Sequence, residues 1–254
     1  MTDRIRIKRY ENNEFSERED LIIQEHRANI YVNGEHYISL MCLPQDLDEL
    51  AVGFLFSEGV IGSYADVVKI DSGSAGDIFV SAAKTPERPK PGKRVLVSGF
   101  AGGSVNLPFL KRENMPRLGG SFTIRADEAV KMARDFNSRS KLFEKTGAVH
   151  SCALIKTDGA SLFYEDVGRH NALDKIIGRA LISGLDIEDG VLLTSGRISS
   201  EILLKTAGLG IPVLISTSAP TNLAVKFAVK INMTLIGFAR GARFNIYSGE
   251  SRVI

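Results

Sequence analysis

The sequence predicts an α/β protein with two domains: a larger domain with a mostly parallel sheet over residues 121–254, and a smaller α+β domain over residues 1–120. The main observation is a pattern that occurs three times in the second half, where a short apolar strand leads into a polar turn and an apolar-striped helix. It occurs in "SLFYEDVGRHNALDKIIGRAL", "GVLLTSGRISSEILLKTAGLG" and "PVLISTSAPTNLAVKFAVK". Repeated strand, turn and helix are typical of right-handed βαβ units on a parallel sheet.

The first half shows strand signals around a single helix. Alternating apolar and polar residues on both sides of the Asn33-Gly34 pair predict a hairpin with a type I′ turn. A helix is expected next, with Asp46 as its N-cap, Glu49 completing a capping box and a stop at Gly59. Two further strands are expected, and they cover residues 77–83 and 93–99.

The second half is expected to begin after a loose stretch rich in charge, Pro and Gly at residues 111–121, where we place the domain boundary. A long helix with Asp127 as its cap is predicted as far as Phe143. The three repeated units follow. A final strand over residues 233–248 closes the predicted sheet.

The composition is that of an ordinary globular protein. Its 254 residues are 44% hydrophobic and 24% charged, and 32 basic against 30 acidic residues leave a net charge of +2. A field that attracts nucleic acid through net charge is therefore not expected. The first residues carry charge without an apolar signal core, and no later apolar run reaches the length of a membrane span. We therefore expect a cytoplasmic protein without membrane contact.

Three polar turns form the candidate binding site: "EDVGRHN", "TSGRISSE" and "STSAPTN". On a parallel sheet they meet beyond the carboxyl ends of the strands, where ligands bind. Helix starts with small or hydroxyl residues favour an anion such as phosphate or pyrophosphate, and arginines add charge. The alternative is that the hydroxyl residues only cap the helices. The candidate residues, including two arginines from the final strand, are Arg169, Ser195, Gly196, Arg197, Ser218, Thr221, Arg240 and Arg243.

His170 lies four residues before Asp174, so on a helix the carboxylate could bond the imidazole and select its tautomer. A general base is conceivable, but Leu173 and Ile177 share that face. A structural histidine at the edge of the core is the favoured interpretation. The turn around it, with Arg169 and Asn171, is then one wall of the anion pocket rather than an acid-base centre.

The two cysteines, Cys42 and Cys152, lie far apart and outside any CxxC pattern. Neither a disulfide framework nor a thiolate metal cage is expected, and each fits a buried apolar position. A strand in "TGAVHSCALI" would place His150 beside Cys152, where an imidazole could assist a thiolate nucleophile. Zinc is not expected, because the H-x-E and P-C-x-x-C patterns of zinc deaminases are absent. The G-x-S-x-G elbow of serine hydrolases is absent too.

Four stretches together resemble the FdhD family of formate dehydrogenase accessory proteins. They are "LAVGFLFSEGVI", "YEDVGRHNALDKIIG", "LLTSGRISSEILLKTAGLGIPVLISTSAPTNLAVKFA" and "TLIGFARGARFNIYS", and the resemblance runs from about Asn29 to the C-terminus. It implies a cytoplasmic homodimer whose larger domain has a three-layer, cytidine-deaminase-like fold without the zinc site. It also implies that sulfur passes from a cysteine desulfurase to the molybdenum bis-guanine-dinucleotide cofactor before formate dehydrogenase receives it.

The resemblance implies a cofactor-binding stretch in the final strand. It falls on Phe238, Ala239, Arg240, Gly241, Ala242 and Arg243. The pyrophosphates and guanines of such a ligand suit the anion turns, which supply Arg169, His170, Asn171, Ser195, Gly196, Arg197, Ser218 and Thr221. GDP is a convenient mimic of one arm of this ligand.

One departure from the family concerns the cysteine that carries the persulfide in a Gly-rich loop. The matching stretch here is "VSGFAGGSV", and Phe100 stands at the cysteine position. The first of three explanations is that the protein binds and delivers the cofactor without carrying sulfur. The others are a sulfurtransferase that uses Cys152 instead, and a diverged form that has lost activity. A non-catalytic nucleotide-binding or regulatory module is a further hypothesis.

Overall fold

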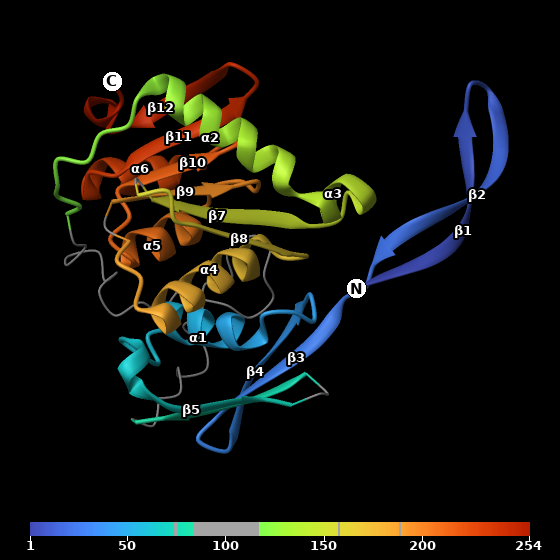
Figure 1. Ribbon diagram of the computed structural model, residues 1–254, viewed down its shortest axis with the longest axis horizontal. Helices are drawn as coiled ribbons and strands as arrows, with labels where there is room; N and C mark the ends of the chain where they lie inside the picture. Colours follow the sequence, from blue (N-terminus) through green and yellow to red (C-terminus); the bar gives the residue numbers. More distant parts are fainter. Residues whose placement is uncertain (74–75, 84–116, 157, 188) are drawn as a thin grey trace.

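The computed structural model describes residues 1–73, 76–83, 117–156, 158–187 and 189–254. The described strands form a two-stranded, a four-stranded and a six-stranded sheet (Figure 1). The elements of the first half are β1 (Thr2–Glu11), β2 (Glu14–Ile23), β3 (His26–Val32), β4 (Glu35–Cys42), α1 (Leu47–Ser57), β5 (Val67–Ser72) and β6 (Asp77–Ala82). Those of the second half are α2 (Ala126–Arg139), α3 (Lys141–Thr146), β7 (His150–Lys156), β8 (Ser161–Asp166), α4 (Arg169–Ser183), β9 (Gly190–Thr194), α5 (Ser200–Gly208), β10 (Val213–Ser216), α6 (Asn222–Ile231), β11 (Thr234–Arg240) and β12 (Arg243–Ser248).

The four-stranded sheet has the order β4-β3-β6-β5 and contains the predicted hairpin. β3 and β4 pair antiparallel around Asn33 and Gly34, whose φ angles of 50° and 84° are those a type I′ turn requires. β6 confirms the strand predicted over residues 77–83. The strand predicted over residues 93–99 lies outside the described residues, and so does the start of the predicted domain boundary, which stays a prediction.

Helix α1 is confirmed, but the predicted capping box at its start is wrong. Asp46 adopts a left-handed conformation with φ 53°, and its side chain makes no capping hydrogen bond. An N-cap side chain reaches the first-turn N–H groups only from an extended backbone, so this conformation prevents the contact. At the other end, Gly59 takes a φ of 71° just beyond the helix, as expected.

The six-stranded sheet is mixed, which corrects the prediction of a mostly parallel sheet. Its order is β12-β11-β10-β9-β7-β8, and only β9, β10 and β11 pair in parallel. β7 is antiparallel to both of its neighbours, β8 and β9, so the two strands of the first repeated unit are parallel in direction but are not adjacent. The predicted final strand is a hairpin of β11 and β12. Because β7 runs opposite to both β8 and β9, β8 points in the same direction as β9, β10 and β11.

Helices cover both faces of this sheet, so the domain has three layers (Figure 1). Alternate strand residues face opposite layers. Cys152 and Leu154 belong to the core shared with α4, α5 and α6, whereas Ala153 and Leu193 belong to the core shared with α2. Nothing in the described residues tests the closer likeness to cytidine deaminases.

The long helix predicted from Asp127 to Phe143 is divided in two. Ser140 leaves the helical conformation with φ −79° and ψ 77°, and its hydroxyl contacts Ser151 at 3.1 Å and the carboxylate of Glu165. Asp127 is not the cap: α2 begins at residue 126, and the Asp127 carboxylate accepts hydrogen bonds from Arg125 at 3.0 and 3.1 Å. The break at Ser140 is therefore held by contacts to the sheet.

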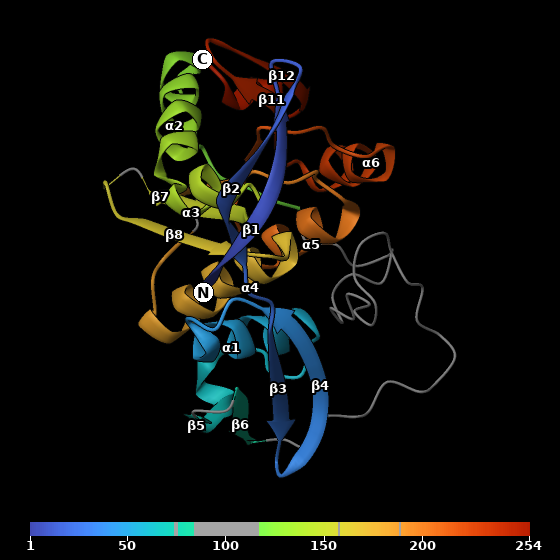
Figure 2. The ribbon, with the colours of Figure 1, turned by 90° about the vertical axis from the view of Figure 1, so that its right-hand side faces the viewer.

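The two halves of the chain meet where α1 crosses α4. Figures 1 and 2 show α1 between α4 and the four-stranded sheet. Gly53 and Gly178 make the close crossing possible, since a methyl group at Gly53 would lie 1.8 Å from the carbonyl oxygen of Asp174. A methyl at Gly178 would lie 1.9 Å from the carbonyl oxygen of Glu49. Only glycine allows these two backbones to approach so closely.

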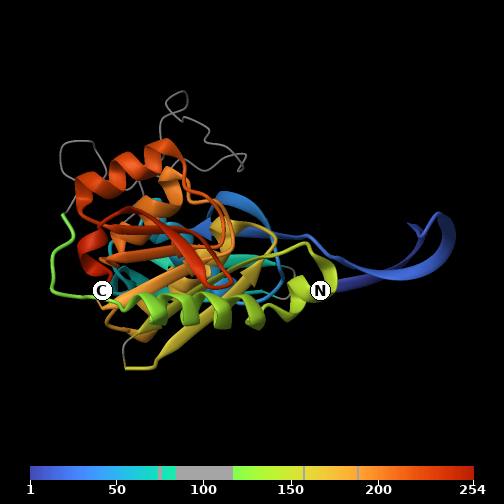
Figure 3. The same cartoon turned by 90° about the horizontal axis from the view of Figure 1, so that it is seen from above.

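The two-stranded sheet, which the sequence reading did not predict, is an arm that extends beyond the rest of the molecule (Figures 1 and 3). β1 and β2 pair antiparallel along their whole lengths. The rings of Tyr10 and Phe15 pack against each other near the tip in a tilted arrangement, with their centroids 5.0 Å apart. Of the helices that the structure describes, none is long and apolar enough to cross a lipid bilayer.

The α1–α4 crossing gives a first prediction. Gly53→Ala is expected to lower the free energy of unfolding by about 2 kcal/mol or more, because the new methyl forces apart two backbones that cannot yield locally. Gly119→Ala is the matched control, since no atom lies within 4 Å of the methyl that it adds. Chemical denaturation of both variants measures the difference. Equal stability of Gly53→Ala and Gly119→Ala would contradict the role of this crossing.

Candidate functional site

The three polar turns lie together at one edge of the six-stranded sheet, as predicted. The turns after β9 and β10 are hydrogen-bonded to each other: the N–H of Ile198 donates to the carbonyl of Ala219 at 3.1 Å. The turn after β8 reaches the same place, where a methyl at Gly196 would lie 3.0 Å from Cδ of Arg169. The carboxyl ends of β8, β9, β10 and β11 therefore share one crevice, the usual ligand position in α/β sheets.

Helix capping explains part of the hydroxyl pattern. Ser199 accepts a hydrogen bond from the N–H of Ile202 at 3.4 Å and caps α5, and Thr221 accepts one from Ala224 at 3.3 Å and caps α6. Ser218 plays another part, because its N–H donates to Ser216 Oγ at 2.8 Å and shapes the turn. The capping interpretation is thus correct for Thr221, while the helix starts still face the crevice.

A cavity of about 540 Å³ opens at this edge, between the strand ends and the break after α2. Of the predicted residues, Ser195 and Arg240 line it. Several other lining residues were not predicted from the sequence, because nothing marked them there except a position next to the end of a strand or helix. The full lining is Phe136, Asn137, Ser140, Phe143, His150, Ser151, Ser195, Thr217 and Arg240.

His150 lines the cavity, whereas the sequence suggested it only as a possible partner of a Cys152 thiolate. It begins β7, and its Nδ1 lies 3.3 Å from Ser195 Oγ, which also accepts a hydrogen bond from the N–H of Ser151 at 3.0 Å. Burial lowers the pKa of His150, and the positive charges of Arg169, His170 and Arg197 lower it further. Burial above all thus favours the neutral imidazole, and the cationic neighbourhood, which acts in the same direction, would attract an anion.

The arginines of this neighbourhood also affect each other. Burial lowers the pKa of Arg169, and the charge of Arg197 lowers it further. Arg197 is exposed, whereas Arg169 is half-buried against Gly196. Two guanidinium groups close enough to repel each other mark a position that a phosphate would stabilise.

The family's implied cofactor stretch contains a strained residue. Phe238 has a φ of 53°, which is rare for a bulky side chain, and it is 38% exposed. Its N–H donates to the carbonyl of Ser218 at 3.0 Å, so the strain ties β11 to the turn after β10. Ala239 is buried. Backbone strain of this kind is common at functional sites.

The two arginines of that stretch are separated by the hairpin turn. Arg240 lies at the crevice, and its Nε donates to the carbonyl of Thr217 at 2.6 Å. Gly241, with φ 61°, and Ala242 form the turn, and Arg243 pairs with Arg240 across the hairpin. Arg243, however, lines a different hollow beside α2. The structure thus brings Arg240 to the cavity and not Arg243.

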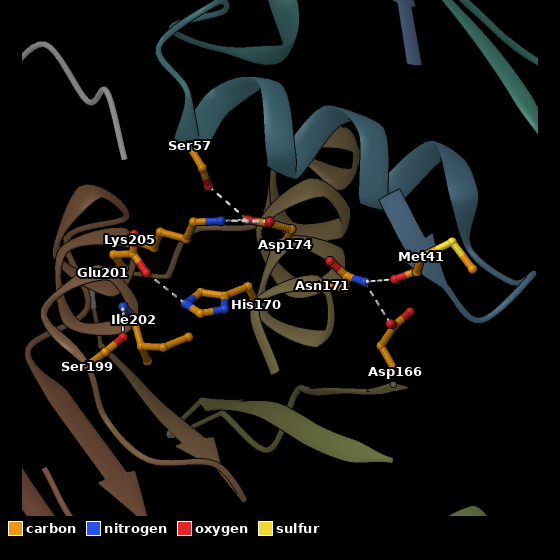
Figure 4. A network of polar contacts seen from close by, with 10 residues as sticks. All are labelled: Met41, Ser57, Asp166, His170, Asn171, Asp174, Ser199, Glu201, Ile202 and Lys205. Carbon is orange, nitrogen blue, oxygen red and sulfur yellow. Dashed lines mark hydrogen bonds and ion pairs between the residues drawn. The ribbon is translucent and has the colours of Figure 1, made fainter. Parts of the chain in front are cut away.

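His170 does not pair with Asp174, which corrects the predicted contact (Figure 4). His170 Nε2 lies 3.2 Å from Glu201 Oε2, on the neighbouring helix α5. Asp174 instead accepts from Lys205 Nζ at 2.7 Å with both oxygens and from the Ser57 hydroxyl at 2.8 Å. Desolvation lowers the pKa of His170. A buried lysine on α5 outcompetes the imidazole for the carboxylate, because it supplies a full charge there.

Asn171 is buried and is not among the residues that line the cavity; Figure 4 shows its amide between Met41 and Asp166. Its amide donates to the carbonyl of Met41 at 2.8 Å and to Asp166 Oδ1 at 2.8 Å. Asp166 also lies 2.7 Å from the Lys175 ammonium, in a pair that is fully buried. These residues join the turn after β8 to the first half of the chain, which explains several of the polar residues in "YEDVGRHNALDK".

Cys152 is buried and shows no property of a sulfur carrier. Desolvation raises its pKa to about 12, so the thiolate is strongly disfavoured. Cys42 is buried as well, and burial together with Asp166 raises its pKa to about 12. Phe100 lies outside the described residues. Within those residues, no cluster of three or more His, Cys, Asp or Glu side chains is arranged to hold a metal.

Comparison with known proteins gives the family. The sequence profile of the FdhD/NarQ family matches residues 23–254. The chain belongs to this family. It is 39% identical over 253 residues to the sulfur carrier protein FdhD of Geobacillus kaustophilus, covering 98% of this chain and 95% of that one. To the protein of the same name from Bacillus subtilis it is 37% identical over 252 residues, with 97% and 95% covered.

A solved structure agrees with this assignment. A crystal structure named for a formate dehydrogenase accessory protein of Desulfotalea psychrophila superposes with a TM-score of 0.84 at 28% identity. The match covers 100% of this chain and 99% of that one, so the arm and both halves are included. The fold that the structure describes for this chain is therefore that of a solved formate dehydrogenase accessory protein.

The cysteines give a second prediction. Under native conditions near pH 8, neither Cys42 nor Cys152 is expected to react with a thiol reagent such as dithiobis(nitrobenzoate), because both thiols are buried with pKa values raised to about 12. Both react once the protein is unfolded. The Cys42→Ala and Cys152→Ala variants assign the signal. Rapid labelling of Cys152 in the folded protein would contradict this prediction and would support the hypothesis that Cys152 carries sulfur.

Proposed function

We propose that this FdhD-family protein binds the molybdenum bis-guanine-dinucleotide cofactor in the crevice and delivers it to formate dehydrogenase, without carrying sulfur on a cysteine of its own. The observation that supports this most is the cavity at the strand ends, where Arg240, His150 and Ser195 line one space beside Arg169 and Arg197. The cofactor brings redox-active molybdenum to the dehydrogenase. This chain holds and orients its nucleotide part.

The cationic side of the cavity suits a diphosphate. Arg240 is anchored by its Nε to the Thr217 carbonyl, which leaves the other guanidinium nitrogens for a ligand. Arg169 and Arg197 lie near enough to His150 to lower its pKa, and Arg197 also lowers the pKa of Arg169. A bound negative charge would offset the repulsion among these three groups. The starts of α5 and α6 add partial positive charge at the same edge.

The opposite side of the cavity suits a nucleobase. Phe143 lines the cavity with 52% of its surface exposed, so its ring is accessible to a ligand. Asn137 adds an amide that can donate and accept. Aromatic faces stack on bases, so a guanine nucleotide can lie with its base toward α3 and its phosphates toward Arg240.

Sulfur carriage is left out of the proposal because of the cysteines. The chain has two, and both are buried. A persulfide on Cys152 would be out of reach of a donor in the folded protein, since its side chain is fully buried in the core that β7 shares with α4, α5 and α6. Transfer from a cysteine desulfurase thus has no exposed thiol to receive it. The homodimer implied by the family stays a prediction.

Arg240 and Arg243 allow a matched test of the binding site. Arg240→Ala is expected to weaken GDP binding by about tenfold or more, the effect of losing a charge-assisted hydrogen bond. Arg243→Ala removes the same charge outside the cavity and should leave the affinity within about twofold of the wild type. Isothermal titration measures both. Equal effects, or none, would reject the assignment, and no GDP binding by the wild type would favour a regulatory module that needs no cofactor.

Proton uptake gives a fourth prediction. His150 has a lowered pKa in the free protein, and a bound phosphate would cancel part of the positive field and raise that pKa. Binding then takes up a proton, so GDP affinity should gain up to about tenfold, relative to His150→Gln, between pH 8 and pH 6. The comparison with His150→Gln removes the titration of GDP itself. His36→Gln, an exposed histidine on β4, should behave as the wild type.

A further inference from the structure

A second hollow of about 760 Å³ lies beside the cofactor stretch, between α2 and the start of β12. We call it the α2–β12 groove. The groove and the cavity share no lining residue: Arg240 lines the cavity, and its cross-strand partner Arg243 lines the groove. The residues of the groove are Ala126, Asp127, Val130, Lys131, Arg134, Ala242, Arg243 and Phe244.

The charge of the α2–β12 groove is positive. Lys131, Arg134 and Arg243 line it, and none of them forms an ion pair with any residue that the structure describes. The single carboxylate of the groove, Asp127, is already bound by Arg125 at 3.0 Å. The three cations therefore offer their charge to a ligand from outside.

One side of the α2–β12 groove is an open strand edge. β12 ends the six-stranded sheet and pairs only with β11 among the described strands. Phe244 is half-buried toward the α2 side of the sheet, and Ile246 follows it with 38% of its surface exposed. An exposed edge strand with apolar residues is ready to pair with another extended chain.

We propose that the α2–β12 groove is the docking site for an acidic extended segment of a partner protein, which adds as a strand to the free edge of β12. Main-chain hydrogen bonds to β12 supply affinity, as in other cases of strand addition. Carboxylates of the segment meet Lys131, Arg134 and Arg243, and its alternate apolar side chains cover Phe244 and Ile246. Charge complementarity and the open edge point to the same occupant.

A peptide fits this groove better than a nucleic acid does. Three cations neutralise few phosphates, and the protein as a whole carries a net charge of only +2. The single aromatic residue of the groove, Phe244, is half-buried, so no exposed ring is available for stacking on bases. An apolar floor beside an open strand is what an extended polypeptide uses.

The position of the groove suggests what docking is for. The same hairpin and the same helix α2 form walls of both hollows: Phe136 and Asn137 line the cavity, while Val130 and Arg134 line the groove. A partner seated on β12 would lie next to the mouth of the cavity and could receive its contents. This purpose rests on the proposed function, but the docking itself does not.

The test uses the full chain and a fluorescein-labelled ten-residue peptide of alternating glutamate and valine, followed by fluorescence anisotropy. Binding is expected to weaken with rising salt and to weaken at least tenfold in the double variant Lys131→Glu, Arg134→Glu. A double variant with the same charge change elsewhere on the surface, Arg9→Glu with Lys226→Glu, should bind as the wild type. Thermal unfolding confirms that both variants are folded.

Four results would overturn the docking site, and the first three concern the peptide itself. They are an absence of peptide binding, equal binding by the two double variants, and undiminished binding of a peptide with an N-methylated backbone, which cannot pair with β12. Displacement by GDP, or by a single-stranded oligonucleotide, would assign the groove to a nucleotide instead. Loss of GDP binding in Arg240→Ala with peptide binding retained separates this inference from the proposed function, since each can fail without the other.

Discussion

The crossing of α1 over α4 is the contact on which the rest of the structure depends. Gly53 and Gly178 let the two helix backbones touch, so the first half of the chain is held at a fixed distance from the sheet. At the same crossing, Ser57 on α1 donates to Asp174 on α4, which also pairs with Lys205 on α5. Removing one partner of such a buried pair would leave an uncompensated charge, at a cost of about 3–5 kcal/mol.

This contact also shapes the site. α4 begins at Arg169, immediately after the turn that follows β8, and Asp166 holds that turn through Lys175 and the N–H of Leu43. The position of Arg169 against Gly196 is therefore set from the first half of the chain as well as from the sheet. The polar residues of "YEDVGRHNALDK" therefore divide into two groups. One group connects the two halves of the chain, and the other faces the edge of the sheet where the polar turns meet.

The site and the family assignment answer different questions. Membership in the FdhD/NarQ family identifies the class of protein, whereas the cavity shows which side chains of this chain are available for an anion and a base. The relatives are named for sulfur carriage, yet the two thiols of this chain are buried. For this reason the function that we propose for this chain is cofactor binding without sulfur transfer.

The sequence by itself determined several of the local elements and the edge of the sheet at which the polar turns meet. The Asn33-Gly34 turn, the helices after the polar turns and the convergence of those turns follow from short-range patterns, because turn geometry and helix periodicity are properties of neighbouring residues. Only the tertiary structure decided the direction of β7, the partners of His170 and Asp174, and the separation of Arg240 from Arg243. These depend on residues far apart in the chain, such as Lys205 and Glu201 on α5, which no local spacing reveals. His150 entered the site for the same reason, because its neighbours Ser195 and Arg169 reach it through the sheet and not along the sequence.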